Sequence, residues 1–162
     1  MTGPIENILV YIDGTEESIT AAEYAICLAK AYGAKLTALY IVNTRALNDL
    51  VRSRIFLESE EQEYTRDLEA DAERYLNHAK ELARAKQLNI ETVKISGSIH
   101  TEIKKHVKDR NIDLLVIGEL SRVQSRRDEF YNEAERAMRS VECSVMIVKD
   151  EDRVLDTYEN LT

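Results

Sequence analysis

The sequence of 162 residues has little of what marks several special classes of protein. It contains two cysteines, one proline, five glycines and no tryptophan. Two distant cysteines, Cys27 and Cys143, cannot make a disulfide scaffold, and the low glycine and proline content excludes collagen-like and low-complexity chains. No apolar run approaches the ~18 residues of a membrane span, and no signal-peptide pattern opens the chain. We therefore expect a cytoplasmic protein with no membrane partner.

Basic residues are outnumbered by acidic ones. The chain has 22 basic and 30 acidic residues, a net charge of −8, which argues against a nucleic-acid partner because such proteins carry a basic footprint. Residues 58–73 hold eight acidic side chains against Arg66, and residues 150–162 hold five against Arg153. We interpret the first run as the solvated face of a helix, with an acidic docking site as the less favoured alternative.

Strand and helix patterns alternate along one domain. We predict residues 1–149 as this domain and residues 150–162 as an acidic tail. Short apolar runs predict strands at residues 8–12, 36–42, 90–96, 114–117 and 143–148. Apolar residues at helical spacing predict helices between them, at residues 15–33, 58–88, 98–107 and 130–141. Residues 43–57 are ambiguous. The alternation predicts an α/β fold with a parallel sheet covered by helices on both faces.

The default ligand site of such a sheet is the crevice at the carboxyl ends of its strands. Two strands end sharply, the first at Asp13-Gly14 and the fourth at Gly118. If these strands are neighbours, Asp13 and Gly118 face each other across the crevice. Asp13 has a second, structural interpretation, because a carboxylate after a strand commonly accepts N–H bonds from the following turn.

Two long stretches resemble the universal stress protein family. Residues 8–42, ILVYIDGTEESITAAEYAICLAKAYGAKLTALYIV, are similar to the first half of such a protein. Residues 97–148, which include DLLVIG and AERAMRSVECSVMIV, are similar to the second half. The resemblance implies a single-domain, Rossmann-like fold of the adenine-nucleotide alpha hydrolase type. Its open five-stranded parallel sheet would have the order 3-2-1-4-5, and the protein would usually be a dimer.

Many members of this family bind ATP through a motif that follows strand four. The motif is a glycine, two residues, a second glycine, nine residues, a third glycine and then Ser or Thr; its glycines let backbone amides approach phosphates. In this chain the four positions are Gly118, Ser121, Tyr131 and Asn132, so the spacing is kept but one residue in four matches. Tyr131 places a Cβ and a ring where backbone should meet phosphate. Asn132 is a residue type that can cap a helix.

The resemblance also implies candidate nucleotide-binding residues. Asp13 matches the family aspartate after strand one, and Ile41 matches the strand-two residue whose backbone lies near adenine. The full candidate set is Asp13, Ile41, Gly118, Ser121, Arg122 and Asn132, with ATP or AMP as the possible ligand. Three arginines, Arg122, Arg126 and Arg127, could bind phosphates by side-chain forks, although pairing with acidic neighbours is the favoured interpretation.

Other chemistry finds no support in the sequence. His78, His100 and His106 have no partner at metal-ligand spacing, so we predict structural histidines and no metal site. Neither cysteine has a neighbouring base, so we predict no catalytic nucleophile.

The two predicted sheet edges differ in charge. Strand three carries Glu91 and Lys94, which discourage pairing with another chain, whereas strand five carries no charge. We therefore predict a homodimer through strand five, with an interface formed by Val145, Met146, Ile147 and Val148.

Two function classes remain open. The first is a dimeric regulatory or interaction module of the stress response, without ATP hydrolysis and without a cofactor, that acts on an unknown protein partner. The second is an adenine-nucleotide-binding stress protein that uses a modified crevice at Asp13, Gly118 and the arginine loop, with slow ATP hydrolysis left open. The loss of the glycines favours the first, and the kept Asp13 and spacing favour the second.

Overall fold

The computed structural model describes residues 3–44, 58–120 and 128–162, and for residues 58–61 and 128–132 it describes the backbone alone. The strands in this part of the chain are β1 (Asn7–Ile12), β2 (Lys35–Asn43), β3 (Glu91–Gly97), β4 (Leu114–Gly118) and β5 (Ser144–Val148). The helices are α1 (Glu16–Tyr32), α3 (Glu58–Arg84), α4 (Ile99–Asp109), α5 (Asp128–Ser140) and α6 (Glu151–Glu159).

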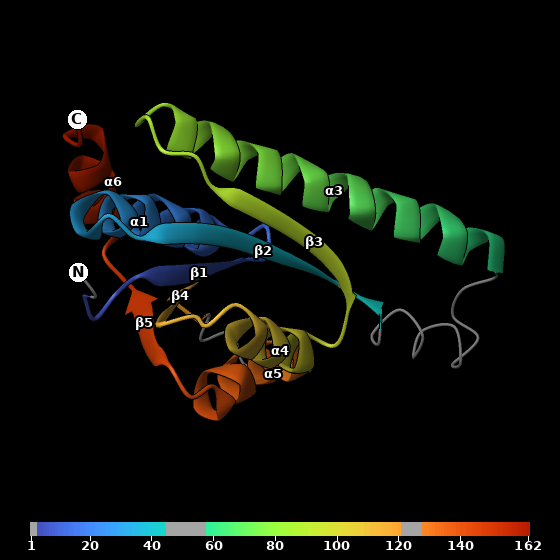
Figure 1. Cartoon of the computed structure of the whole chain (residues 1–162). Helices are drawn as coiled ribbons and strands as arrows, with labels where there is room; N and C mark the ends of the chain where they lie inside the picture. The colour runs from blue at the N-terminus through green and yellow to red at the C-terminus, as the bar shows by residue number, and fades with distance from the viewer. Residues whose placement is uncertain (1–2, 45–57, 121–127) are drawn as a thin grey trace.

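The five strands form one parallel sheet in the order β3-β2-β1-β4-β5, which confirms the predicted fold and order. Helices α1 and α3 lie on one side of this sheet, and α4 and α5 lie on the other (Figure 1). Right-handed crossovers explain the arrangement, because the chain must change side when it passes from the β3 half of the sheet to the β4 half. The strand order reverses at β1 and β4, so the crevice lies at their carboxyl ends.

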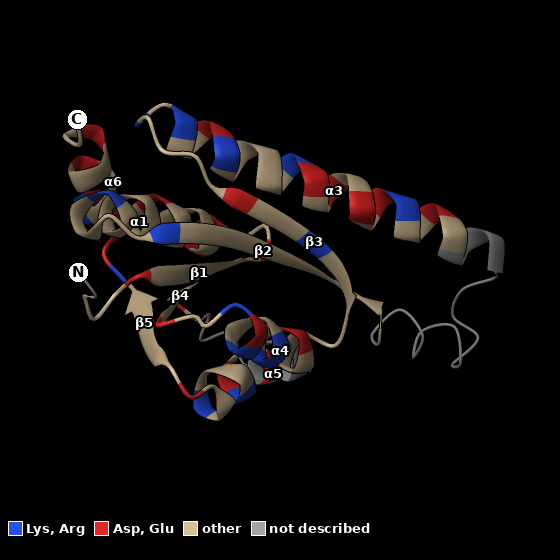
Figure 2. Cartoon of the chain, in the orientation of Figure 1, with Lys and Arg blue, Asp and Glu red and all other residues tan. Residues whose placement is uncertain are grey.

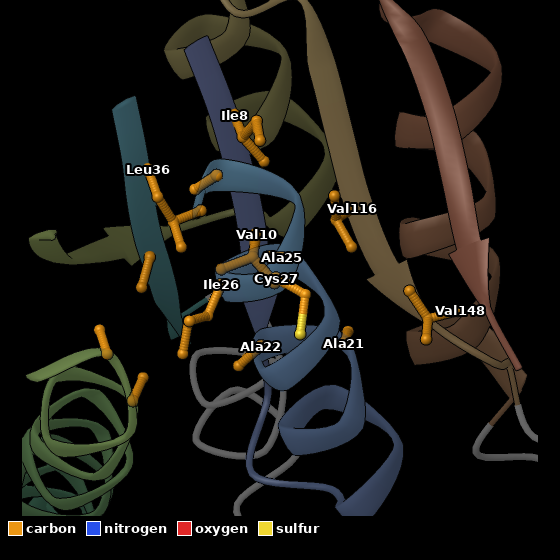
Figure 3. Close-up of a cluster of buried hydrophobic side chains, with 14 of the residues drawn as sticks. Ile8, Val10, Ala21, Ala22, Ala25, Ile26, Cys27, Leu36, Val116 and Val148 are labelled. Atoms are coloured by element: carbon orange, nitrogen blue, oxygen red, sulfur yellow. The ribbon is translucent and has the colours of Figure 1, made fainter. Parts of the chain in front are cut away.

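Each side of the sheet has its own apolar core. Along β1, Ile8, Val10 and Ile12 pack beneath α1, whereas Leu9 and Tyr11 pack toward α4 and α5. Figure 3 shows the side chains of β1, β2 and β4 that face α1. All five of these β1 side chains are at most 6% exposed, so the central strand is buried on both faces.

Charge protects one edge of the sheet, as the sequence predicts. On β3, Lys94 Nζ lies 2.9 Å from Glu73 Oε1 of α3, and Glu91 Oε2 lies 2.9 Å from Arg110 Nη1. The opposite edge strand, β5, has no charged residue. Its Ile147 side chain is 38% exposed.

The acidic run lies on a helix that projects past the sheet. Helix α3 is 27 residues long, and its N-terminal part extends beyond the end of β3 (Figure 1). Red acidic positions follow this helix in Figure 2. The described side chains of Glu63, Asp67, Glu69 and Glu73 are exposed, as expected for a solvated face.

The C-terminal residues expected as an acidic tail contain a packed helix. Helix α6 buries Val154 and Tyr158 against the core beneath α1. The Tyr158 hydroxyl donates to the carbonyl oxygen of Leu82 in α3 at 2.7 Å. Lys86 Nζ donates to the carbonyl oxygen of Leu161 at 2.9 Å and lies over the Tyr158 ring. These contacts join the end of the chain to both α1 and α3.

Candidate functional site

The turn after β1 is held by hydrogen bonds within six residues. Asp13 Oδ1 accepts a bond from the Thr15 N–H at 3.0 Å and another from the Thr15 hydroxyl at 2.6 Å. Thr15 is the N-cap of α1, and its Oγ1 accepts the Ser18 N–H at 3.1 Å. Gly14 has a φ of 85°, which glycine adopts at no steric cost. The turn hydrogen bonds expected of a structural role for Asp13 are thus present. The Asp13 side chain is nevertheless exposed.

Gly118 packs against the start of α1. A Cβ on Gly118 would lie 2.5 Å from the carbonyl carbon of Glu17 and 2.9 Å from the backbone nitrogen of Ser18. Real Cβ atoms do not approach backbone so closely, so only glycine fits without a shift of α1. Gly118 is therefore required by packing, whether or not a ligand binds beside it.

Three of the candidate residues, Asp13, Ile41 and Gly118, come together at the carboxyl ends of the strands. The register pairs Ile12 with Tyr40, which places Ile41 beside Asp13 at the ends of β1 and β2. Pairing of Val10 with Val116 brings β1 and β4 together, as expected, and sets Gly118 beside the end of β1. The Ile41 side chain is buried in the core below α4, so its backbone is the part that a ligand could reach.

Of the remaining candidates, the structure describes only the backbone of Asn132. Ser121 and Arg122 lie outside the described residues, as do Arg126 and Arg127. Asn132 lies inside α5, which begins at Asp128. The expectation that Asn132 caps this helix is therefore wrong, because the helix starts four residues earlier. The arginines of the ambiguous segment 43–57, Arg45, Arg52 and Arg54, also lie outside the described part of the chain, which includes only Asn43 and Thr44 of that segment.

Sequence reasoning missed a polar cluster between α4 and α5. Ser98 occupies the N-cap position of α4 but makes no side-chain cap bond. Glu133 of α5 reaches this end instead: Oε2 accepts the Ser98 hydroxyl at 3.3 Å and the His100 N–H at 3.4 Å. Glu133 Oε1 lies 3.3 Å from His100 Nδ1, and Ser98 Oγ lies 3.3 Å from the same nitrogen. Both partners share one ring nitrogen, so this is not the relay of a serine hydrolase.

No signal along the chain pointed to this cluster, because Glu133 and His100 are 33 residues apart. Two of the three histidines make contacts within the described residues. His100 is held by Glu133, and His106 Nδ1 lies 2.8 Å from the carbonyl oxygen of Glu102. His78 is exposed on α3.

Burial and nearby negative charge raise the pKa values of two tyrosines, Tyr11 and Tyr40. Burial raises the pKa of Tyr11 well above its ordinary value, and the charges of Asp13 and Glu133 add to the shift. Burial likewise raises the pKa of Tyr40 to about 12, with Asp13 as the next cause. The Tyr40 ring stacks on Tyr75, with 6.2 Å between centroids. Negative charge therefore acts on both sides of β1 at its carboxyl end.

Residues 3–44, 58–120 and 128–162 form no arrangement suited to an activated cysteine nucleophile or to a metal ion. Burial raises the pKa of Cys27 and of Cys143, which disfavours the reactive thiolate. No group of three or more His, Cys, Asp or Glu side chains in these ranges could hold a metal ion. None of the helices in the described part of the chain has both the length and the apolar composition needed to cross a bilayer.

Known proteins similar to this chain agree with the fold. A universal stress protein of Methanocaldococcus jannaschii is 26% identical over 144 residues, which cover 89% of this chain and 82% of that protein. The solved structure of UspA from Lactobacillus plantarum matches with a TM-score of 0.72 at 22% identity, over 91% of this chain and all of that one.

Two further solved structures carry nucleotides. A family protein from Arabidopsis thaliana with AMP bound has a TM-score of 0.65 at 15% identity, and covers 91% of this chain and 94% of its own. A universal stress protein in complex with cAMP has a TM-score of 0.67 at 18% identity, with 91% and 99% covered. The sequence model of the Universal stress protein family matches residues 4–149. With nine-tenths of its length matched by that model, this chain belongs to the universal stress protein family.

Proposed function

We propose that this chain is a dimeric regulatory module of the stress response that does not hydrolyse ATP and is not an enzyme. The observation that carries the proposal is the start of α5 at Asp128. Only the first four N–H groups of a helix lack an intrahelical partner. Asn132 is the fifth residue of α5, so its N–H belongs to the helix ladder and is withdrawn from phosphate binding.

Phosphate release from Mg-ATP tests this proposal. We expect release by the purified protein to equal that of a buffer blank, because neither the third glycine nor a free amide at residue 132 is available to hold the β- and γ-phosphates. An Asp13→Ala variant serves as the control for a contaminating ATPase. Release that exceeds the blank and disappears in Asp13→Ala would contradict the proposal.

The proposed dimer forms through β5. Its support is the difference between the two edge strands: β3 is blocked by the ion pairs of Lys94 and Glu91, and β5 offers an uncharged edge. Val145 and Ile147 lie on the α5 side of this edge, with Ile147 exposed. Met146 is partly buried, and the Val148 side chain is 5% exposed in the protein's own core, so Val148 would contribute backbone rather than side chain.

A double substitution, Val145→Lys with Ile147→Lys, tests the dimer. Two cations on the edge strand should prevent strand pairing, and light scattering should report half the mass of the wild type. Tyr32→Lys is the matched control, because Tyr32 is a 55% exposed apolar residue of α1 and not part of the β5 strand. An unchanged mass for the double variant would remove this interface.

Binding of an adenine nucleotide, ATP or AMP, is a second candidate function. The observation in its favour is that Asp13, Ile41 and Gly118 meet at one edge of the sheet. The AMP and cAMP complexes of proteins with the same fold add support. The proposal as a whole includes a cytoplasmic location, consistent with free thiols at Cys27 and Cys143, and an unidentified protein partner.

A further inference from the structure

A cavity lies at the amino ends of the strands, opposite to the ends that form the crevice. Its volume is about 400 Å³, within the range of small-molecule sites. Its lining includes Asn7, Lys35, Thr37, Glu91, Arg110 and Ile112. These residues come from the starts of β1, β2 and β3 and from the segment that follows α4. Strand β1 is six residues long, so it separates the cavity from the crevice by about 20 Å.

A hydroxyl without a hydrogen bond lines this cavity. Thr37 is 8% exposed, and its side chain makes no hydrogen bond within the described part of the chain. In residues 3–44, 58–120 and 128–162, the one fully enclosed side-chain oxygen or nitrogen without a partner belongs to Glu102, so the Thr37 oxygen keeps an opening. The cavity that Thr37 lines supplies this opening. The hydroxyl can therefore donate to a ligand in the cavity or accept from it.

The strand pattern places Thr37 on the α4 side of the sheet. Leu39 and Ile41, two and four residues further along β2, pack in the core on that side. The register pairs Thr37 with Glu91, so the Glu91 side chain lies on the same side. Arg110 directly follows α4 and meets Glu91 there. The hydroxyl, the carboxylate and the guanidinium thus face one space.

Two cations and one carboxylate line the cavity. Glu91 Oε2 lies 2.9 Å from Arg110 Nη1, and a guanidinium has five N–H donors, so donors remain for a ligand. Lys35 is exposed, and its ammonium has no ion pair among the residues that the structure describes. Figure 2 shows blue at the start of β2 and red at the start of β3. A ligand with one negative charge matches this balance, whereas the carbonyl end of α4 disfavours a doubly charged anion.

Hydrogen bonds hold the wall of the cavity in place. Asp113 Oδ2 accepts the Glu6 N–H at 2.6 Å and the Asn7 N–H at 2.7 Å. Asn7 Nδ2 donates to the carbonyl oxygen of Asn111 at 3.2 Å. These bonds join the segment after α4 to the start of β1. The site is therefore formed before a ligand enters, which reduces the entropic cost of binding.

We propose that this cavity binds a small hydroxy acid of one negative charge, with Lys35 and Arg110 at the carboxylate, the Thr37 hydroxyl at the ligand hydroxyl and Ile112 against its apolar part. The inference goes beyond the proposed function and does not depend on it, because Asp13 and Gly118 lie at the other ends of the strands. Such a site would give the protein a small-molecule input separate from the crevice.

Amide NMR titrations of the full chain with mandelate test this site. Mandelate combines a carboxylate, a hydroxyl and an apolar ring; phenylacetate lacks the hydroxyl, and mandelamide lacks the charge. The variants are Lys35→Gln, which removes the unpaired cation, and Thr37→Val, which replaces the hydroxyl by a methyl group. Lys104→Gln is the control, because Lys104 is an exposed residue of α4 that does not line the cavity. Thermal melts should show that all three variants stay folded.

The wild type should bind mandelate more tightly than phenylacetate, mandelamide or inorganic phosphate, with shifted amides at the starts of β1, β2 and β3. Lys35→Gln should weaken mandelate binding about tenfold, whereas Lys104→Gln should leave it unchanged. Thr37→Val should remove the preference for mandelate over phenylacetate. Equal affinity of Lys35→Gln and Lys104→Gln, or tighter binding of phosphate or mandelamide, would overturn the assigned ligand class. Absence of shifts at these amides with every probe would overturn the site itself and leave the proposed function untouched.

Discussion

The turn after β1 and the contact between α4 and α5 are built by different means. On the β1 side, Asp13, Thr15 and Ser18 bond to one another within six residues, and the backbone of α1 packs directly on Gly118. On the α5 side, Glu133 reaches α4 from 33 residues away. The first side is a turn set by neighbouring residues, and the second depends on how two helices pack.

Substitution of Gly118 by alanine is expected to have the largest effect. The added Cβ would overlap backbone atoms of Glu17 and Ser18, which cannot move aside as a flexible side chain does. We expect the free energy of unfolding to fall by about 3 kcal/mol, measured by urea denaturation. Gly3→Ala is the control, because a Cβ there meets nothing within 4 Å. Equal stability of the two variants would show that α1 and β4 are not in tight contact.

Thr15→Ala should have a smaller effect on the same side of the crevice. It removes the cap bond to the Ser18 N–H and the hydroxyl bond to Asp13. The expected loss in the free energy of unfolding is about 1 kcal/mol. Thr157→Ala is the matched control: it deletes a hydroxyl bonded to a carbonyl within the exposed face of α6 and should change stability by less than about 0.5 kcal/mol. A loss no larger than that of the control would mean that the turn does not depend on its cap.

The shift in the pKa of Tyr40 caused by Asp13 should be the smallest of these effects. Its raised pKa means that the folded state favours the neutral phenol, so this contribution to stability is complete below the ordinary value of 10.0 and is lost as the pH rises through about 12. The difference between tyrosinate absorbance of the wild type and of Tyr40→Phe should have its midpoint near 12. Asp13→Asn should lower that midpoint, because the Asp13 charge adds to the shift. A midpoint at 10 that Asp13→Asn leaves in place would contradict the negative field on this side.

The local features of the fold could be predicted from the sequence. The five strands, the turn at Asp13-Gly14 and the charges of β3 each depend on residue patterns a few positions long, whereas the strand order followed from the family resemblance. Gly118 was chosen for a ligand, yet its contact with Glu17 shows a packing reason that a linear pattern does not contain.

Features that depend on distant contacts were not predicted. The last residues were expected as a tail because their charge dominated the pattern, although Val154 and Tyr158 have helical spacing. That helix is held by the burial of Val154 and Tyr158 and by the bond from Tyr158 to Leu82, 76 residues away. The start of α5 was placed too late because residues 119–129 are polar, and the Glu133 cap of α4 has no sequence signature.

We propose that the crevice retains its strand-end turn and lacks the means to hold a nucleotide's β- and γ-phosphates. Calorimetric titration with Mg-ATP beside AMP tests it most directly. We expect Mg-ATP to bind no more tightly than AMP. Mg-ATP affinity tenfold or more above that of AMP would contradict it, because about 1.4 kcal/mol would then have to come from contacts to those two phosphates.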